Sequence, residues 1–313
     1  MQGLGAGVPV KGRSVVEGRR IVLAKRHRKV RIGMLKAMPE KWDVVGNWAV
    51  FEEQFKRHKG DELDVFITPE CFLDGYAVTE ENWTVGRFKR VAQDIKTSPY
   101  IRKVKGLARR SSTNIVFGYT EYLDGKFYNA ALLVGRDGKI IGSYYKTHLQ
   151  NQDRRFARGE DLPVFDLDFG KVGMVICADR RWPESMRALR LKGAEICLMP
   201  TYGMCHLDNE WWMRTRSYEN QMYVCFAHPA VSLITDPKGG LEAKLQSSDP
   251  AVLVHEIDLA NVNDENHLSN RRPELYGILA DEDHASRQED YEPVQVGGNR
   301  SCSKSTGRKS NRR

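Results

Sequence analysis

The sequence predicts an α/β fold in which helices cover the outer faces of two packed mixed sheets. Three features of the 313-residue chain indicate it. In the first third, apolar strand-like runs alternate with amphipathic helical segments, which is typical of βα units. In the middle, short strands follow one another across Asp-Gly turns, which indicates hairpins. Hydrophobic residues make up 41% of the chain, enough for a sizeable core.

The first third of the chain supplies the alternating elements. We expect strands at 30–35 and 64–68, and helices at about 43–59 and 99–111. The strands are short and apolar, and the second ends at Pro69. The second helix is basic and carries apolar residues at helical spacing, namely Ile101, Val104 and Leu107.

From residue 114 onward the expected elements are mostly short strands. Helices are expected at 183–192, with Pro183 in the first turn, and at 209–221. No internal repeat or linker interrupts this part, so we expect one domain over residues 29–290. The strands are expected at 114–122, 127–135, 139–145, 164–167, 172–177, 195–199, 222–227, 232–235 and 251–259.

The net charge of +8 is concentrated at the two ends of the chain. Residues 1–29 carry eight Lys and Arg against one acid, and residues 300–313 carry six against none. The remaining body has 35 basic and 40 acidic residues, so its net charge is −5. We therefore expect basic, disordered extensions at 1–28 and 291–313. Such tails can attract nucleic acid or an anionic surface, but nucleic acid is not the partner that we expect.

Cysteine use and hydropathy favour a cytoplasmic enzyme without a metal. Six cysteines in a chain of this length, with no Cys-x-x-Cys pair and no zinc-type His/Cys spacing, indicate neither a disulfide framework nor a metal site. No run of about 18 apolar residues predicts a membrane span, and the first 30 residues lack the apolar core of a secretory signal.

Cys177 is the first residue that suggests chemistry. It ends an apolar run and precedes Ala-Asp-Arg-Arg-Trp-Pro-Glu, so that a strand stops at a thiol just before a helix. A strand-turn-helix arrangement presents a nucleophile at a sheet edge, and a helix N-terminus with nearby cations favours the thiolate. The alternative is a buried strand cysteine that packs as a small hydrophobic residue.

Glu70 and Lys146 also follow expected strands. Glu70 lies among apolar neighbours, where a carboxylate can serve as a general base, although a plain turn carboxylate is an alternative. Lys146 would hold an oxyanion as a fixed positive charge, although a lysine that extends to solvent is commoner. The three residues are informative only together: parallel strands would bring their ends to one sheet edge, where α/β sites usually lie.

As a set, these segments resemble the nitrilase, or carbon–nitrogen hydrolase, superfamily. Its three signatures match Pro69-Glu70, Tyr145-Lys-Thr-His-Leu and Cys177-Ala-Asp-Arg-Arg-Trp-Pro-Glu. Further matches lie at 128–129, 214–224 and 232–239, so the resemblance covers roughly residues 30–280. The resemblance implies a four-layer αββα sandwich of the nitrilase type that forms a homodimer, or a higher homo-oligomer, through its helices.

The resemblance also implies a mechanism. Glu70 would take the proton of Cys177, and the thiolate would attack an amide, carbamoyl or nitrile carbon. Lys146 and the backbone N–H of Ala178 would hold the oxyanion. Ammonia or an amine would leave, and water would then release the acyl group from its thioester. Neither a metal nor an organic cofactor is implied.

Within the superfamily, 179–184 and 270–277 resemble the N-carbamoyl-amino-acid amidohydrolases most closely. In that branch the arginines after the nucleophile hold the substrate carboxylate, which by position implies Arg180 and Arg181; a guanidinium suits this task. The alternative is an ion pair with a structural acid such as Glu184. Many members carry a second glutamate soon after the lysine, where this chain offers only Asp153 and Glu160, so this fourth role stays unassigned.

The leading hypothesis is therefore a hydrolase that releases ammonia from a small, carboxylate-bearing amide or N-carbamoyl substrate. One alternative is a nitrilase acting on a nitrile, although Ala178-Asp179 does not match the Trp-Glu pair that usually follows the cysteine there. Another is a catalytically idle binding protein whose basic tails hold nucleic acid. Four side chains have structural interpretations: Trp211 and Trp212 as core or dimer-interface aromatics, and His148 and His206 as satisfied histidines. Cys71 is not expected to be the nucleophile, because no sharp turn is indicated there.

Overall fold

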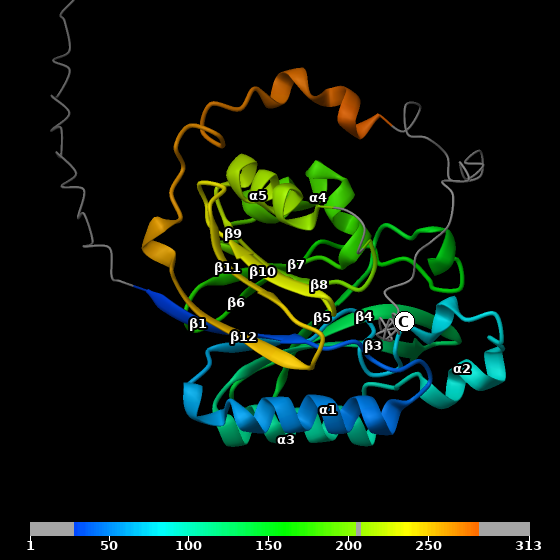
Figure 1. The fold of residues 1–313 in the computed structure, drawn as a ribbon. Coiled ribbons are helices and arrows are strands. Elements are labelled where there is room, and N and C mark those ends of the chain that lie inside the picture. Colours follow the sequence, from blue (N-terminus) through cyan, green and yellow to red (C-terminus); the bar gives the residue numbers. More distant parts are fainter. Residues whose placement is uncertain (1–27, 205–207, 282–313) are drawn as a thin grey trace, which may run out of the picture.

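Two six-stranded sheets stack face to face, and helices cover the outer face of each (Figure 1). The computed structural model describes residues 28–204 and 208–281. The predicted extensions at 1–28 and 291–313 lie outside the described residues, apart from Arg28, and so does His206. The domain limits 29–290 stay a prediction.

The first sheet has the strand order β12-β1-β2-β3-β4-β5 and carries α1 and α3 on its outer face (Figure 1). β2 runs parallel to β1 and β3, whereas β4, β5 and β12 pair antiparallel. The elements are β1 (Lys29–Lys36), α1 (Val44–Arg57), β2 (Val65–Ile67), α2 (Val85–Val91), α3 (Pro99–Ser111), β3 (Asn114–Leu123), β4 (Lys126–Val134), β5 (Ile140–Tyr145) and β12 (Ala251–Asp258).

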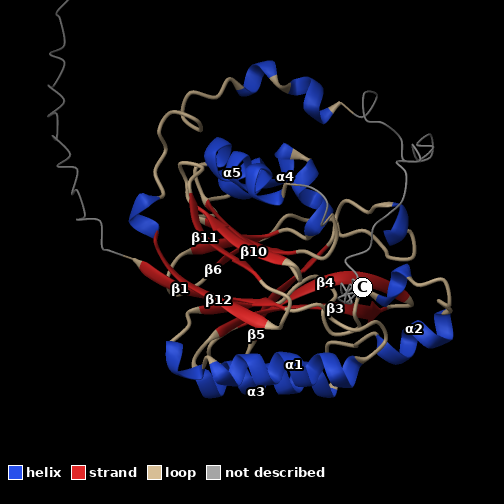
Figure 2. Cartoon of the chain, in the orientation of Figure 1, coloured by secondary structure: helices blue, strands red, loops and turns tan. Residues whose placement is uncertain are grey.

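The second sheet has the order β11-β10-β9-β8-β7-β6 and lies under α4 and α5 (Figure 2). β7, β8 and β9 are parallel, and the remaining pairs are antiparallel. The elements are β6 (Val164–Asp166), β7 (Lys171–Met174), α4 (Pro183–Leu191), β8 (Ile196–Pro200), α5 (Asn209–Asn220), β9 (Tyr223–Ala227), β10 (Val231–Thr235) and β11 (Leu241–Gln246). The order of layers confirms the predicted αββα sandwich with two mixed sheets.

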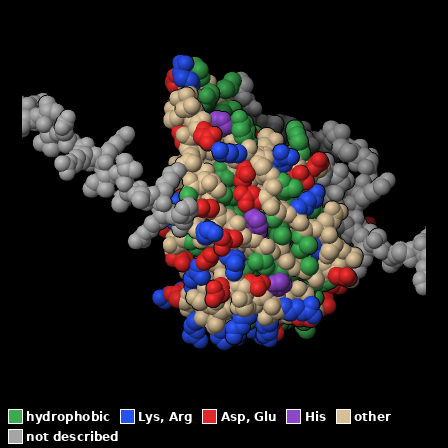
Figure 3. All heavy atoms as spheres, turned by 60° about the vertical axis from the view of Figure 1, so that its left-hand side comes forward, with side chains coloured by type: hydrophobic (Ala, Val, Ile, Leu, Met, Phe, Trp, Pro, Cys, Tyr) green, Lys and Arg blue, Asp and Glu red, His purple; other side chains and the backbone are tan. Residues whose placement is uncertain are grey.

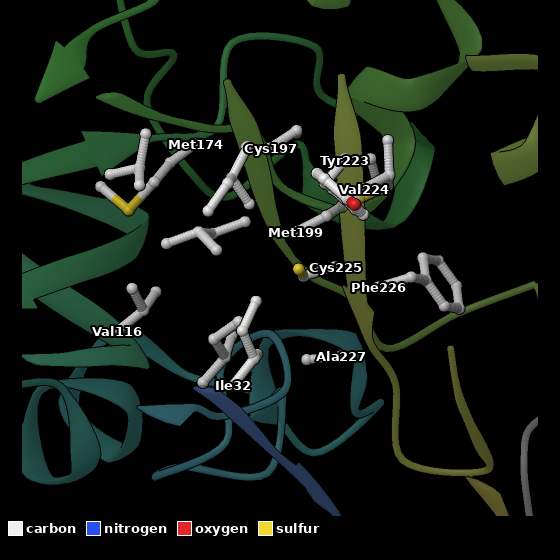
Figure 4. Close-up of a cluster of buried hydrophobic side chains, with 14 of the residues drawn as sticks. Ile32, Val116, Met174, Cys197, Met199, Tyr223, Val224, Cys225, Phe226 and Ala227 are labelled. Atoms are coloured by element: carbon white, nitrogen blue, oxygen red, sulfur yellow. The ribbon is translucent and has the colours of Figure 1, made fainter. Parts of the chain in front are cut away.

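Alternation along the strands builds two apolar layers. In β2, Val65 and Ile67 face the second sheet, and Phe66 between them packs under α1 and α3. Figure 4 shows the inter-sheet layer, in which Ile32 and Val116 of the first sheet share a cluster with Met174 and Cys225 of the second. Among the described residues, the strand backbones are hydrogen-bonded within each sheet and not from one sheet to the other. Side-chain packing therefore sets the distance between the sheets.

The helices begin where the sequence places polar caps. Asp43 accepts the backbone N–H of Gly46 at 2.8 Å at the start of α1. Ser98 accepts two backbone N–H groups ahead of Pro99 at the start of α3. In residues 28–204 and 208–281, none of the helices is long and apolar enough to cross a bilayer.

The structure departs from the predicted elements in four places. β7 ends at Met174, so Cys177 does not end the strand but begins a 3₁₀ helix, Cys177–Arg181. α2 was not predicted, because only Phe88 and Val91 of its seven residues are buried. β11 was missed because it is a half-exposed edge strand. Cys71 has φ +43°, so the expectation that the chain does not turn sharply there is wrong.

Basic charge is not confined to the ends of the chain. Residues 85–111, which contain α2 and α3, carry nine Lys and Arg against one acid, Asp94. Figure 3 shows Lys and Arg side chains gathered along the lower edge of the molecule, where α1 and α3 form the outer layer. The net charge of −5 for the body therefore hides a strongly basic helical face.

Gly118 in β3 offers a test of how this sheet supports the loop after β2. A Cβ at Gly118 would overlap the carbonyl oxygen of Pro69 and press on the backbone N of Cys71. Gly118→Ala is therefore expected to lower the free energy of unfolding by about 1–3 kcal/mol, as measured by urea denaturation. Gly86→Ala in α2, where a Cβ meets nothing within 4 Å, is the control and should not destabilise. A wild-type midpoint for Gly118→Ala would contradict the prediction.

Candidate active site

The three predicted catalytic residues follow three strands and converge between the sheets. Glu70 follows β2 and Lys146 follows β5 in the first sheet, whereas Cys177 follows β7 in the second. The expectation that parallel strands of one sheet edge would assemble them is therefore wrong. The end of β8 joins the two sides: Glu70 N donates to Thr201 O at 3.4 Å, and the backbone N–H of Tyr202 donates to the Cys177 thiol.

Glu70 is fully buried, and only one of its carboxylate oxygens is occupied. Oε1 accepts hydrogen bonds from Lys146 Nζ at 2.8 Å and from Asn129 Nδ2 at 2.7 Å. Oε2 is buried and has no hydrogen-bond partner. A buried oxygen without a hydrogen-bond partner lowers stability, so such an atom calls for an explanation such as a role in binding or catalysis. This geometry fixes the carboxylate and leaves one acceptor available for a proton.

Lys146 lies between two carboxylates. Its Nζ contacts Glu70 Oε1 at 2.8 Å and Asp153 Oδ2 at 2.7 Å, and all three side chains are buried. Burial opposes the charge, but Asp153 and Glu70 together raise the pKa of Lys146 well above its ordinary value. The ammonium therefore stays protonated at neutral pH and is available as a fixed positive charge.

Asp153 is the residue at the position that sequence reasoning left open. It lies in the 3₁₀ helix Asn151–Asp153, whereas Glu160 is exposed. Its second oxygen accepts the hydroxyl of Tyr76. Asp153, Tyr76 and Asn129 were not predicted as site residues, because their roles depend on long-range contacts. The one available signal was the Tyr128-Asn129 pair among the matching segments.

Cys177 has the backbone conformation of a sharp turn. Its φ is +47°, a left-handed conformation that is unusual for a residue with a side chain, and its side chain is buried. Burial raises the pKa of the thiol, and Glu70 raises it further, against the opposite effects of Arg180 and Lys146. The expectation that the surroundings favour the thiolate is therefore wrong on balance. The thiol needs a base, which the geometry offers in Glu70.

Asp179 ties the lysine segment to the cysteine turn. Its Oδ1 accepts from His148 N at 2.9 Å, His148 Nδ1 at 2.8 Å and Thr147 Oγ1 at 3.1 Å. Its Oδ2 accepts from Tyr144 OH at 2.6 Å and Ile176 N at 2.8 Å. One buried carboxylate thus connects the residues around Lys146 with those around Cys177. His148 also stacks on Trp182, which supports its structural interpretation.

The remaining predicted residues follow Cys177 in its 3₁₀ helix. Ala178 is fully buried directly after the nucleophile, and the role of its N–H stays a prediction. Arg180 is fully buried, with Nη1 at 3.4 Å from Cys177 Sγ, whereas Arg181 is exposed. Of the predicted aromatics, Trp212 packs against the core and Trp211 is 69% exposed.

This chain is similar to known proteins in sequence and in fold. Residues 31–264 match the family model described as carbon-nitrogen hydrolase. A Pseudomonas protegens protein named hydrolase in pqqF 5'region is 33% identical over 81% of this chain and 93% of its own length. An Arabidopsis thaliana N-carbamoylputrescine amidase is 25% identical over 76% of this chain and 91% of its own length.

Solved structures with the same fold include two from the nitrilase superfamily. Nit3 of Saccharomyces cerevisiae superposes with a TM-score of 0.66 at 21% identity, covering 84% of this chain and 97% of that chain. An amidase from Nesterenkonia sp. gives a TM-score of 0.68 at 20% identity, covering 80% and 96%. A mutant of that amidase holds the acetamide moiety of fluoroacetamide covalently at its active-site cysteine. These similarities confirm the predicted nitrilase-type fold.

The connection through Asp179 can be tested by an isosteric change. In Asp179→Asn, the amide NH₂ would face a backbone N–H donor, of Ile176 or of His148, whichever way it turned. The free energy of unfolding is expected to fall by about 1–3 kcal/mol, measured by chemical denaturation. Asp166→Asn, at an exposed ion pair with Lys171, is the control and should change little. Equal stability of the two variants would show that the connection does not hold the segments together.

Proposed function

Because the chain belongs to the carbon–nitrogen hydrolase family, we propose that it hydrolyses a non-peptide C–N bond in a small amide or N-carbamoyl substrate and releases ammonia. The observation that carries the proposal is the Glu70 carboxylate. One of its oxygens is fixed by Lys146 and Asn129, and the other is buried without a partner in the site that contains Cys177. This is the arrangement that a general base requires before it accepts a proton.

In the first step, the Sγ–H proton of Cys177 passes to Glu70, and the sulfur attacks the carbonyl carbon. The raised pKa of the Cys177 thiol makes this transfer necessary, because burial keeps the resting thiol protonated. An S–C bond forms while the carbonyl π electrons move to oxygen. The protonated Lys146 and the N–H of Ala178 are the donors that we assign to this oxyanion.

In the second step, the C–N bond breaks and the leaving nitrogen takes the proton from Glu70, so ammonia departs and a thioester remains on Cys177. Glu70 is again ionised and accepts a proton from water. The resulting hydroxide attacks the thioester carbon and the C–S bond breaks, with its electron pair remaining on sulfur. The carboxylic acid, or the carbamic acid from an N-carbamoyl substrate, leaves, and Glu70 returns its proton to the Cys177 thiolate. Asp153 keeps Lys146 in position throughout, since its oxygen contacts Nζ at 2.7 Å.

We assign the substrate carboxylate to one of the two arginines that follow Cys177. Arg181 is exposed and lies at the end of the 3₁₀ helix that begins at Cys177. Arg180 is buried behind the sulfur. Arg181 is therefore better placed to bind an incoming carboxylate with its guanidinium. Arabidopsis N-carbamoylputrescine amidase and yeast omega-amidase NIT3 are among the relatives, so both N-carbamoyl and amide substrates merit testing.

We also propose a homodimer formed through the second helical layer. Trp211 and Tyr218 of α5 are exposed, and so are large apolar residues of the segment at 273–281, which lies outside α4 and α5 in Figure 1. Contiguous exposed apolar surface is typical of protein interfaces. The expectation of a reducing, cytoplasmic setting stays a prediction.

Ammonia release should distinguish the substrate classes. Purified protein is expected to release ammonia from propionamide, succinamate and N-carbamoylglycine, but not from propionitrile. Cys177→Ala should abolish turnover, and Glu70→Gln should reduce kcat/KM about 10²–10⁴-fold because the general base is lost. Glu160→Gln, which changes an exposed carboxylate of the same region, is the control and should keep wild-type rates.

Two results would contradict the proposal. Turnover by a folded Cys177→Ala variant would exclude the covalent mechanism, and preference for the nitrile over every amide would exclude the substrate class. If Arg181→Met raises KM for succinamate, which has a carboxylate, but not for propionamide, which has none, the carboxylate assignment would be supported.

The dimer proposal predicts a change in mass. Ile278→Asp combined with Leu279→Asp is expected to convert the dimer to a monomer in size-exclusion chromatography with light scattering, because a buried apolar contact would receive two unpaired charges. Val45→Asp on α1, at an exposed valine of the opposite outer layer, is the matched control and should leave the mass unchanged. A dimer that survives the double change but not the control would place the interface on the other layer.

A further inference from the structure

The guanidinium of Arg180 is held directly beside the reactive sulfur. Nη1 lies 3.4 Å from Cys177 Sγ and donates to the Cys177 carbonyl at 2.6 Å. Nη2 donates to Asn209 Oδ1 at 3.0 Å. The rings of Trp212 and Phe226 lie 5.0 and 5.4 Å from the guanidinium carbon. The side chain is fully buried, so these contacts fix where its charge lies.

In the part of the chain that the structure describes, no carboxylate forms an ion pair with Arg180. The carboxylates of Asp153, Asp179 and Glu219 pair instead with Lys146, His148 and Arg216. Lys146 differs, because Glu70 and Asp153 both contact its ammonium. The group of Glu70, Lys146 and Asp153 therefore carries a net charge of −1 beside Cys177. Such a charge opposes a thiolate, and Glu70 indeed raises the pKa of the thiol.

We propose that Arg180 is the counter-cation of the Cys177 thiolate and acts on the nucleophile in the first chemical step. This inference rests on the proposed function. When the Sγ–H proton passes to Glu70, the carboxylate loses its charge and the sulfur gains one at 3.4 Å from Nη1. The negative charge moves from a site near Lys146 to a site near Arg180. Each form of the pair therefore has a buried cation beside it, which lowers the cost of the transfer in a medium of low dielectric.

One further cation lies near Arg180: Arg181 contacts the same Met204 sulfur, but it is exposed to solvent, which screens its charge. His228 packs on Phe226 and has a pKa of about 3, lowered by burial and by Arg180, so it is neutral near pH 7. Among the residues that the structure describes, the ionisable groups around the sulfur also include Glu70, Lys146, Tyr76 and Tyr202. Burial raises the pKa of both tyrosines, so they are also neutral at pH 7. Among the described residues, Arg180 is thus a cation that contacts the sulfur and has no carboxylate paired with it.

The test measures the nucleophile without requiring turnover. Cys177 of the full-length chain is alkylated with iodoacetamide from pH 5.5 to 9.5, and its peptide is followed by mass spectrometry. In Arg180→Met, the apparent pKa of alkylation should rise and the rate at pH 7 should fall about tenfold or more. Arg190→Met on α4, an arginine that contacts backbone carbonyls of Asn220 and Ala194, is the matched control and should keep the wild-type profile.

A second variant keeps the arginine in place. Asn209→Asp has nearly the same shape and puts a carboxylate on Nη2, so the cation gains a permanent counter-ion and alkylation should slow in the same direction. If Arg180→Met does not fold, the alkylation profile of Asn209→Asp decides the outcome. Wild-type alkylation profiles in both variants, or in Asn209→Asp alone when Arg180→Met is unfolded, would overturn the proposal.

Turnover separates this role from substrate binding. If Arg180 acts on the sulfur, kcat for propionamide, which has no carboxylate, should fall as far as kcat for N-carbamoylglycine. A loss confined to KM for N-carbamoylglycine would overturn the proposal in favour of a carboxylate site. If the wild-type chain hydrolyses none of the amides while alkylation still depends on Arg180, the proposed function fails and the role of Arg180 stands.

Discussion

The buried ammonium of Lys146 requires both of its carboxylate partners, and the positions of several segments follow from that requirement. A charge removed from water is tolerated only when it is paired and hydrogen-bonded. Glu70 reaches Nζ from the loop after β2, and Asp153 reaches it from a 3₁₀ helix. Asn129 donates to the same Glu70 oxygen as Lys146, and Tyr76 donates to the Asp153 oxygen that Lys146 leaves over. Five side chains are thus held by electrostatics rather than by shape alone.

The network also explains which atoms are left for chemistry. The described donors to the Glu70 side chain, namely Lys146 and Asn129, both reach Oε1, so Oε2 is left as the oxygen that the proposed mechanism uses to accept a proton. On the other side of the site, Cys177 adopts φ +47° at the start of a 3₁₀ helix, and Asp179 holds that turn against the segment of Lys146. The first sheet thus contributes the acid and the ammonium, the second contributes the sulfur, and the carboxylate of Asp179 sets one relative to the other.

Much of this was predictable from sequence where the signal is local. The short apolar strands, the helix that begins at Pro99 and the positions of Glu70, Lys146 and Cys177 shortly after strands all depend on neighbours within a few residues. The predictions that failed concern residues that are far apart in the sequence but in contact in the fold. Asp153 has no distinctive neighbours, and its role exists only because the loop brings it to Nζ. The direction of the pKa shift of Cys177 likewise follows from burial and from Glu70, which a sequence cannot place. Edge strand β11 lacks an apolar pattern because solvent, not a neighbouring layer, covers much of it.

Because the groups of the proposed mechanism lie on both sheets, the apolar layer between the sheets sets the distance between them. Val116 and Met174 are not among the residues of the proposed mechanism, yet side chains of this layer determine how far the sulfur-bearing sheet stands from the one that bears Glu70. Folding tolerates a lost methylene in such a layer at modest cost, whereas proton transfer tolerates only small changes in separation. Substitutions at these interior positions should accordingly reduce the catalytic rate more than they reduce thermal stability. Laboratory evolution of the site would therefore have to include the apolar residues between the sheets.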